Sequence, residues 1–205
     1  PTSSRRQRQM CIRDRTIDGS NAKDFDDAVY AEELSDGFRL YVAIADVSAY
    51  VAKDSQLDKE AFSRATSVYF EKKVIPMLPE LISNQLCSLR PNEDKLVLTC
   101  EIYLDNRGEI KDFEFFNSVI CSKNRLTYDE VEKFYQKGQT ALLDDAVNNL
   151  RVLKKIHSLR RKIREDRKAI DFYLPEYRPV GKDNKIIKFK ATSHLLANEV
   201  IEESM

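Results

Sequence analysis

The sequence has no excess charge of either sign, no long apolar run and no signal-peptide pattern, and each absence excludes a class of protein. Lys and Arg together number 34, as do Asp and Glu, so net charge does not indicate a nucleic-acid binder. Any attraction for a polyanion must come from local patches. No apolar stretch approaches the ~20 residues of a membrane-spanning helix, and no signal peptide opens the chain. We therefore expect no membrane partner.

Cysteine is also scarce, and no two cysteines form a Cys-x-x-Cys motif. The four thiols are far apart, at Cys11, Cys87, Cys100 and Cys121. This spacing argues against a zinc ribbon and is compatible with reduced thiols, so we expect a cytoplasmic protein. The chain has 205 residues, of which 42% are apolar and 33% charged, as in a soluble globular domain with a sizeable core. The sequence indicates no obligate protein partner.

What the sequence does have is a dense acidic cluster. Asp18, Asp24, Asp26 and Asp27 fall within ten residues, and an apolar strand pattern follows at once. Like charges this close repel one another unless they are solvated or a cation lies among them. Hard divalent cations such as Mg²⁺ prefer carboxylate oxygens and retained waters. The cluster is therefore either a site for one or two Mg²⁺ ions acting on phosphate or an acidic surface loop, and spacing alone does not decide between them.

Two simpler sites do not match the cluster. An EF-hand loop that began at Asp18 would need Gly at its sixth position and Glu at its twelfth, where the sequence has Lys23 and Val29. A phosphatase of the Asp-x-Asp-Gly type places its nucleophile at the end of an apolar strand. Residues 13–17, which precede Asp18, read Arg-Asp-Arg-Thr-Ile, and this pattern does not predict such a strand.

Alternation of apolar and polar residues predicts strands in antiparallel pairs. The first pair covers residues 28–34 and 38–46, joined by a Ser-Asp-Gly turn. We expect the second of these strands to be central in its sheet, because neither face carries much charge. Further predicted strands cover residues 96–104, 110–120, 169–174 and 185–189. Since neighbouring strands pair rather than alternate with helices, we predict an α+β fold with a mixed, mostly antiparallel sheet flanked by helices.

Apolar spacing and capping residues predict the helices. Thr127 has the side chain of an N-cap and Glu130 follows three residues later, a capping box that begins a helix over residues 128–135. Further predicted helices cover residues 57–65, 80–85, 141–168 and 195–205, the last with Thr192 or Ser193 as its N-cap. Basic residues along the long helix could follow phosphates, although such a face is more often simply solvated. His157 and His194 have no partner at ligand spacing.

Several blocks of the sequence together resemble one family. Thr-Ile-Asp-Gly at 16–19 and Ala-Lys-Asp-Phe-Asp-Asp-Ala-Val at 22–29 are similar to the signature of the ribonuclease II/ribonuclease R family, in its RNB catalytic domain. Further blocks follow in the family order at residues 42–48, 66–70, 74–80 and 86–89, and Arg-Leu-Thr-Tyr at 125–128 matches the family's Arg-Leu-x-Tyr block. The residues of these blocks are closer to those of ribonuclease R than to those of ribonuclease II. The resemblance covers residues 16–205, which we expect to be the N-terminal part of a truncated catalytic domain. Residues 1–15 do not resemble the family and are expected to be a tail or scar.

The resemblance also implies roles for particular residues. It implies that Asp18, Asp24, Asp26 and Asp27 bind Mg²⁺, as two ions, and that Asp26 and Asp27 are catalytic. It implies RNA-binding roles for four more residues: Tyr69 and Phe172 by stacking on the terminal bases, and Tyr128 and Glu202 by selecting ribose through its 2′-hydroxyl. The residues themselves leave other interpretations open, because the three aromatic side chains could belong to the core and Glu202 to a solvated helix face.

The activity that the resemblance implies is Mg²⁺-dependent, processive 3′→5′ hydrolysis of single-stranded RNA to 5′-mononucleotides. The carboxylates alone would indicate only metal-assisted phosphoryl chemistry. The second half of the family's domain supplies further catalytic groups, so we expect this chain alone to be incomplete for activity. Two alternatives remain open: a non-catalytic RNA- or metal-binding remnant of the family, and a two-metal endonuclease or phosphatase.

Overall fold

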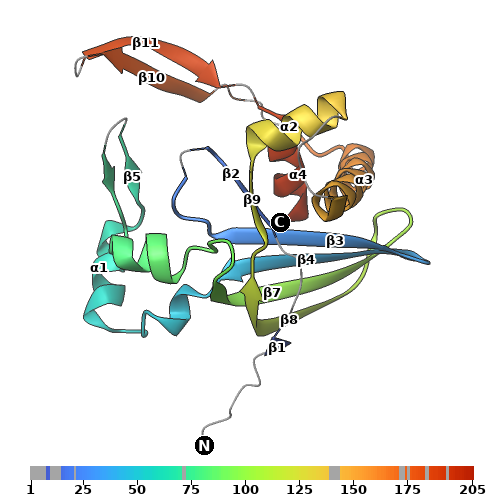
Figure 1. The fold of residues 1–205 in the computed structure, drawn as a ribbon, viewed down its shortest axis with the longest axis horizontal. Coiled ribbons are helices and arrows are strands. Elements are labelled where there is room, and N and C mark those ends of the chain that lie inside the picture. Colours follow the sequence, from blue (N-terminus) through green and yellow to red (C-terminus); the bar gives the residue numbers. More distant parts are fainter. Residues whose placement is uncertain are drawn as a thin grey trace, which may run out of the picture.

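The computed structural model describes residues 8–9, 15–20, 22–70, 73–138, 144–170, 174, 176–182, 185–192 and 194–205. Its centre is a seven-stranded sheet in the order β1-β8-β7-β4-β3-β2-β9, flanked by helices (Figure 1). The strands of this sheet are β1 (Arg8–Gln9), β2 (Arg15–Asp18), β3 (Asp27–Leu34), β4 (Gly37–Ala45), β7 (Asp94–Asp105), β8 (Ile110–Cys121) and β9 (Asn124–Thr127). The pairs β1–β8 and β2–β9 are parallel and the others antiparallel, which confirms the predicted α+β fold and mixed sheet.

Two small hairpins and several helices complete the described part of the chain. The hairpins pair β5 (Val68–Tyr69) with β6 (Val74–Ile75) and β10 (Glu176–Lys182) with β11 (Lys185–Thr192). The helices are the 3₁₀ turn η1 (Val47–Ala49), α1 (Gln56–Arg64), the π-helical turn η2 (Ile82–Leu86), α2 (Tyr128–Lys137), α3 (Asp144–Asp166) and α4 (Leu196–Ser204). No helix in the described ranges is long and apolar enough to cross a membrane.

The central strands follow the predicted alternation. β4 is the fourth strand of seven, between β7 and β3, so the prediction of a central strand is confirmed. It places Leu40 and Val42 on one face and Ala43 on the other. The hairpin from β3 closes at Gly37, where an added Cβ would clash with the carbonyl oxygen of Leu104 on β7. Glycine is therefore required there, because the backbones of two neighbouring strands approach each other closely.

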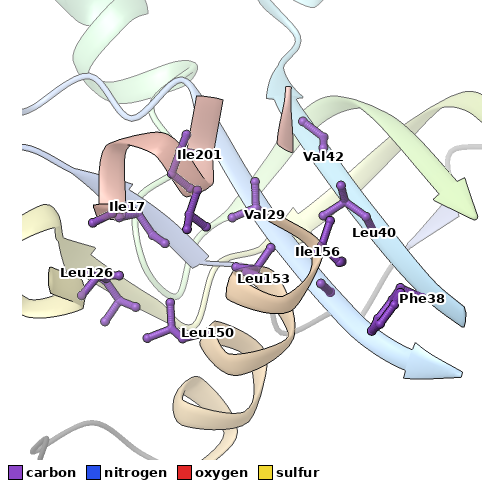
Figure 2. Packing of buried hydrophobic residues seen from close by; sticks show 14 of the residues in the cluster. Ile17, Val29, Phe38, Leu40, Val42, Leu126, Leu150, Leu153, Ile156 and Ile201 are labelled. Atoms are coloured by element: carbon purple, nitrogen blue, oxygen red, sulfur yellow. The ribbon is translucent and has the colours of Figure 1, made fainter. Parts of the chain in front are cut away.

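Each face of the sheet covers its own apolar core. In the larger core, helices α2, α3 and α4 pack on one face, and Figure 2 shows the labelled side chains of this cluster, among them Ile17, Val29 and Leu153, pointing toward one another. The smaller core lies on the other face and includes Phe25 and Leu89. Burial of each such side chain contributes about 1.5–3 kcal/mol. The acidic cluster thus begins directly after Ile17 of one core and contains Phe25 of the other.

The structure corrects three predictions of local structure. Residues 15–18 form strand β2 although their letters do not predict one, because β2 pairs with β3 on one side and β9 on the other. The strand predicted over residues 169–174 is also wrong. Ala169, Ile170 and Leu174 lie outside any strand, and residues 171–173 are outside the described ranges.

The N-cap predicted for the last helix is also wrong in part. Thr192 belongs to β11, Ser193 is outside the described ranges, and the N-cap of α4 is Leu195, whose N–H donates to the Asn198 side chain at 3.1 Å. The capping box at Thr127 and Glu130 is confirmed, with both reciprocal bonds formed.

Candidate metal site at the β2–β3 loop

The four aspartates lie at the facing ends of two paired strands and on the loop between them. β2 ends at Asp18 and β3 begins at Asp27. The two strands are antiparallel, with Arg15 opposite Val29, so the chain leaves the sheet after Asp18 and returns to the same end at Asp27. The loop carries Asp24 and Asp26. The loop therefore rejoins the sheet directly after Asp26, where β3 begins.

Phe25 anchors the acidic loop in the smaller core. Its side chain is buried, its N–H donates to the hydroxyl oxygen of Ser88 at 3.1 Å, and its carbonyl accepts from the N–H of Leu89 at 2.9 Å. The Ser88 hydroxyl in turn donates to the carbonyl of Lys23 at 2.9 Å. Because side chains alternate along an extended segment, the inward Phe25 leaves its neighbours Asp24 and Asp26 facing away from the core.

Burial and mutual repulsion raise the pKa values of three of the carboxyl groups. Burial raises the pKa of Asp18 to about 7, and the charges of Asp27 and Asp26 add to the rise. Burial, with the charge of Asp26, raises the pKa of Asp27 to about 6. Although Asp26 is exposed overall, the protein around its carboxyl raises its pKa, and the charge of Asp24 adds to this. A divalent cation would reverse this effect, because its charge favours ionised carboxylates.

An unpartnered oxygen tests whether these residues suit a metal ion. The Oδ2 atom of Asp18 is buried and has no hydrogen-bond partner in the described part of the chain, whereas buried carboxyl oxygens almost always have one. In the described ranges, no three His, Cys, Asp or Glu side chains already close around a common point. Mg²⁺ keeps several waters and is usually held by one or two carboxylates plus substrate phosphates. The donor set therefore fits Mg²⁺ as an open site.

Tyr69 lies beside the acidic cluster rather than in the core. It is on β5 of the β5–β6 hairpin and its side chain is 64% exposed, so the alternative of a core aromatic is wrong for this residue. Its hydroxyl donates to Asp24 Oδ2 at 2.9 Å. Burial of the hydroxyl and this hydrogen bond raise the pKa of Tyr69. An exposed aromatic ring is thus tied to one of the four carboxylates.

Tyr128 is the first residue of α2 and lies close enough to the strand-end aspartates Asp18 and Asp27 for their charges to act on it. Its ring packs against the larger core, as the alternative interpretation allowed. Burial and then the charges of Asp18, Asp27 and Glu202 raise its pKa to about 12. Glu202 lies on α4, is exposed, and has one oxygen 3.5 Å from Nε2 of His194. The structure therefore brings Tyr128 and Glu202 into the same electrostatic neighbourhood as the strand-end aspartates. Phe172 lies outside the described residues.

Sequence reasoning missed residues that hold the site together. Ser88 and Arg125, which contacts the loop backbone, belong to blocks that the resemblance singled out, so position within those blocks was an available signal. The side chain of Asn198 acts to lower the pKa of Tyr128, and Asn198 had no signal of its own. A glycine, Gly19, directly follows Asp18. Its φ is not positive and an added Cβ would meet no atom within 4 Å, so the turn does not depend on glycine there.

Comparison with known proteins agrees with the fold. The family model described as the RNB domain matches residues 10–205. Ribonuclease R of Acidithiobacillus ferrooxidans is 50% identical over 159 residues, which are 77% of this chain and 36% of that protein. Ribonuclease R of Escherichia coli is 42% identical over 195 residues, 93% of this chain and 24% of that protein.

A solved structure shows the same arrangement of elements. Mycoplasma genitalium RNase R in complex with ribose-methylated single-stranded RNA superimposes with a TM-score of 0.92 at 37% identity, over 98% of this chain and 32% of that chain. The chain thus spans between 24% and 36% of the length of the relatives named here. Since the family model covers nearly all of its residues, the chain belongs to the RNB domain family.

Proposed function

We propose that the protein carrying this chain is a Mg²⁺-dependent 3′→5′ exoribonuclease that processively hydrolyses single-stranded RNA to 5′-mononucleotides. In this proposal the chain supplies the metal-binding part of the active site. The observation that carries it is the buried, unpartnered oxygen of Asp18 at the end of β2, with Asp27 brought back beside it. Similar M. genitalium RNase R structures are complexes with single-stranded and double-stranded RNA, which supports RNA as the ligand here.

The four aspartates would hold the metal, with Asp26 and Asp27 nearest the chemistry. A Mg²⁺ pair held there would supply the activation of water and the stabilisation of the leaving oxygen of a phosphodiester. For the protein's part, Asp18 and Asp27 must release the protons that their raised pKa values favour before they can bind the metal as carboxylates. The fixed β2–β3 end and the Phe25 anchor present the carboxylates without reorganisation, which lowers the entropy cost of assembling the site.

Aromatic and polar residues around the aspartates would bind the end of the RNA. The exposed ring of Tyr69 can stack on a base of any sequence, at about 1–3 kcal/mol per base, and we assign the same role to Phe172. With its pKa raised to about 12, Tyr128 keeps its hydroxyl proton at neutral pH. It can therefore donate to a ribose 2′-oxygen while Glu202 accepts from the 2′-hydroxyl. We also propose a cytoplasmic location, which the free Cys87, Cys100 and Cys121 support.

The test uses the complete gene product that contains this sequence. We would incubate it with 5′-labelled single-stranded RNA and with the matching DNA, in Mg²⁺ and in EDTA. The proposal predicts a ladder that shortens from the 3′ end, on RNA only and in Mg²⁺ only. Internal cuts would instead indicate an endonuclease.

One observation favours a second candidate, a non-catalytic RNA- or metal-binding member of the family. The carboxylates in the described ranges do not close around a common point. Tight, metal-independent RNA binding without any cleavage by the complete protein would support this candidate over the exoribonuclease.

A further inference from the structure

Arg125 connects strand β9 to the acidic loop across a long separation in sequence. β9 pairs in parallel with β2, and Arg125 lies opposite Thr16. One guanidinium nitrogen of Arg125, Nη2, donates toward the carbonyl oxygens of Ser20 at 2.8 Å, Gly19 at 3.2 Å and Ala22 at 3.4 Å. The Ala22 N–H donates to the Gly19 carbonyl at 3.0 Å. The guanidinium group of Arg125 thus contacts three backbone carbonyls of the turn that follows Asp18.

The other side of the guanidinium group is held by the loop's core anchor. The Arg125 Cζ atom lies 4.8 Å from the centroid of the Phe25 ring, within the range of a cation–π contact. Phe25 is itself fixed by burial and by its bonds to Ser88 and Leu89. A planar guanidinium group can stack on a ring and donate from its edge at the same time, which an ammonium group cannot do.

These contacts leave the carboxylates available. The three donor contacts of Arg125 go to backbone carbonyls, so they use none of the lone pairs of the aspartates. The positive charge of Arg125 still acts on Asp18 and opposes the repulsion from the other aspartates. Arg125 therefore contacts the backbone of the acidic turn and leaves the carboxylate side chains free to bind a cation.

We propose that Arg125 is a positioning residue. By holding the carbonyls of Gly19, Ser20 and Ala22 while it contacts the Phe25 ring, it fixes the separation between Asp18 on β2 and Asp24 on the loop. Both aspartates can then bind the same divalent cation. This inference rests on the metal site of the proposed function. It adds that the site's affinity for the metal depends on a residue that does not touch the metal.

The test measures binding of Mg²⁺ alone, by calorimetry without RNA, to the complete protein. Arg125→Gln is expected to weaken Mg²⁺ binding by about 10- to 100-fold, the usual cost of losing an outer support of a metal ligand. Arg125→Lys is expected to weaken it by about 10-fold or more, because it keeps the charge but loses the shared stacking and donation. The matched control is Arg107→Gln, an exposed arginine in the β7–β8 turn, which should bind as the wild type does.

Each contrary outcome has a distinct meaning. Unchanged Mg²⁺ affinity in folded Arg125→Gln would overturn the positioning role while the proposed function stands. Wild-type affinity in Arg125→Lys would assign the effect to charge alone and also overturn it. Loss of folding in both variants, seen by thermal unfolding in EDTA, would make Arg125 a general stability residue. If the wild-type protein itself binds no Mg²⁺, the metal site and this inference fail together.

Discussion

The four aspartates fall into two pairs that the fold treats differently. Asp18 and Asp27 stand at strand ends inside the seven-stranded sheet, and burial raises their pKa values to about 7 and about 6. Asp24 and Asp26 stand on the loop, on either side of the anchored Phe25. Pairing of β2 with β3 fixes the first pair, whereas Ser88, Leu89 and Arg125 fix the second. The sheet therefore concentrates charge repulsion at one end, and the loop brings further oxygens to it.

The largest expected effect comes from neutralising one member of each pair. In the complete protein, Asp27→Asn and Asp26→Asn should each lower RNA hydrolysis by about 100- to 1,000-fold, as loss of a preorganised electrostatic group does. RNA binding should remain nearly intact, because Asn keeps the shape of the side chain. Single-turnover kinetics and filter binding measure the two quantities. Wild-type turnover in Asp26→Asn would remove the loop pair from the metal site.

Truncation of the aromatic ring next to the loop pair should have the next largest effect. Tyr69→Ala should leave longer end products, because the terminal bases lose a stacking partner worth about 1–3 kcal/mol. Tyr69→Phe keeps the ring and loses only the hydrogen bond to Asp24, so its product length should match that of the wild type. Denaturing gels of exhaustive digests measure both. An unchanged product length in Tyr69→Ala would contradict the stacking role.

The strand pair should also make stability depend on pH in the absence of metal. A raised pKa means that the folded state holds the Asp18 proton more tightly than the unfolded state does. Asp18 therefore costs no stability below about pH 4, and its penalty develops as pH rises toward about 7. Asp18→Asn should remove that penalty. Discounted for solvent screening, the gain at pH 8 is about 1 kcal/mol, or about 2–4 °C in Tm.

Thermal unfolding in EDTA at pH 5 and at pH 8 measures this effect. The control is Asp36→Asn in the exposed turn between β3 and β4, which should change Tm little at either pH. An Asp18→Asn variant that is less stable than the wild type at pH 8 would show that Asp18 is not repelled in the folded state.

The smallest effect is expected at the residue that approaches the strand pair from α2. Tyr128→Phe removes one hydrogen-bond donor, worth about 0.5–1.5 kcal/mol, and should reduce the preference for RNA over DNA by about 2- to 10-fold. Competition between matched RNA and DNA oligonucleotides measures the preference. A preference that survives unchanged in both Tyr128→Phe and Glu202→Gln would place the ribose contact elsewhere.

Much of the fold could be predicted because its strands and helix ends follow from patterns among residues close together in the sequence. Alternation along β3, β4, β7 and β8, and the reciprocal cap at Thr127, are local features that the structure bears out. β2 could not be predicted this way. It contains a buried arginine, Arg15, and owes its conformation to pairing with strands on both sides. β10 was not predicted because it contains Pro179, and a proline argues against a strand inside a sheet. Proline is tolerated in edge strands, and both strands of a two-stranded hairpin such as β10–β11 are edge strands.

The candidate site shows the same division. The four aspartates could be found because they are adjacent in sequence and match a family signature. Their support could not be derived from spacing, because the contacts of Phe25 with Ser88 and of the loop carbonyls with Arg125 join residues 63 or more positions apart. The pairing of β2 with its neighbours and the contacts of Arg125 with the loop carbonyls are seen only in the folded chain.

The measurement that tests the central claim most directly is a crystal structure of the complete protein soaked in Mn²⁺, as an anomalous scatterer in place of Mg²⁺. The account predicts an anomalous peak at the β2–β3 loop, bound by carboxylate oxygens from both pairs, Asp18 or Asp27 together with Asp24 or Asp26. A fully occupied peak elsewhere with none at this loop would contradict the metal site. A peak bound by the loop pair alone would contradict the role assigned to the strand ends.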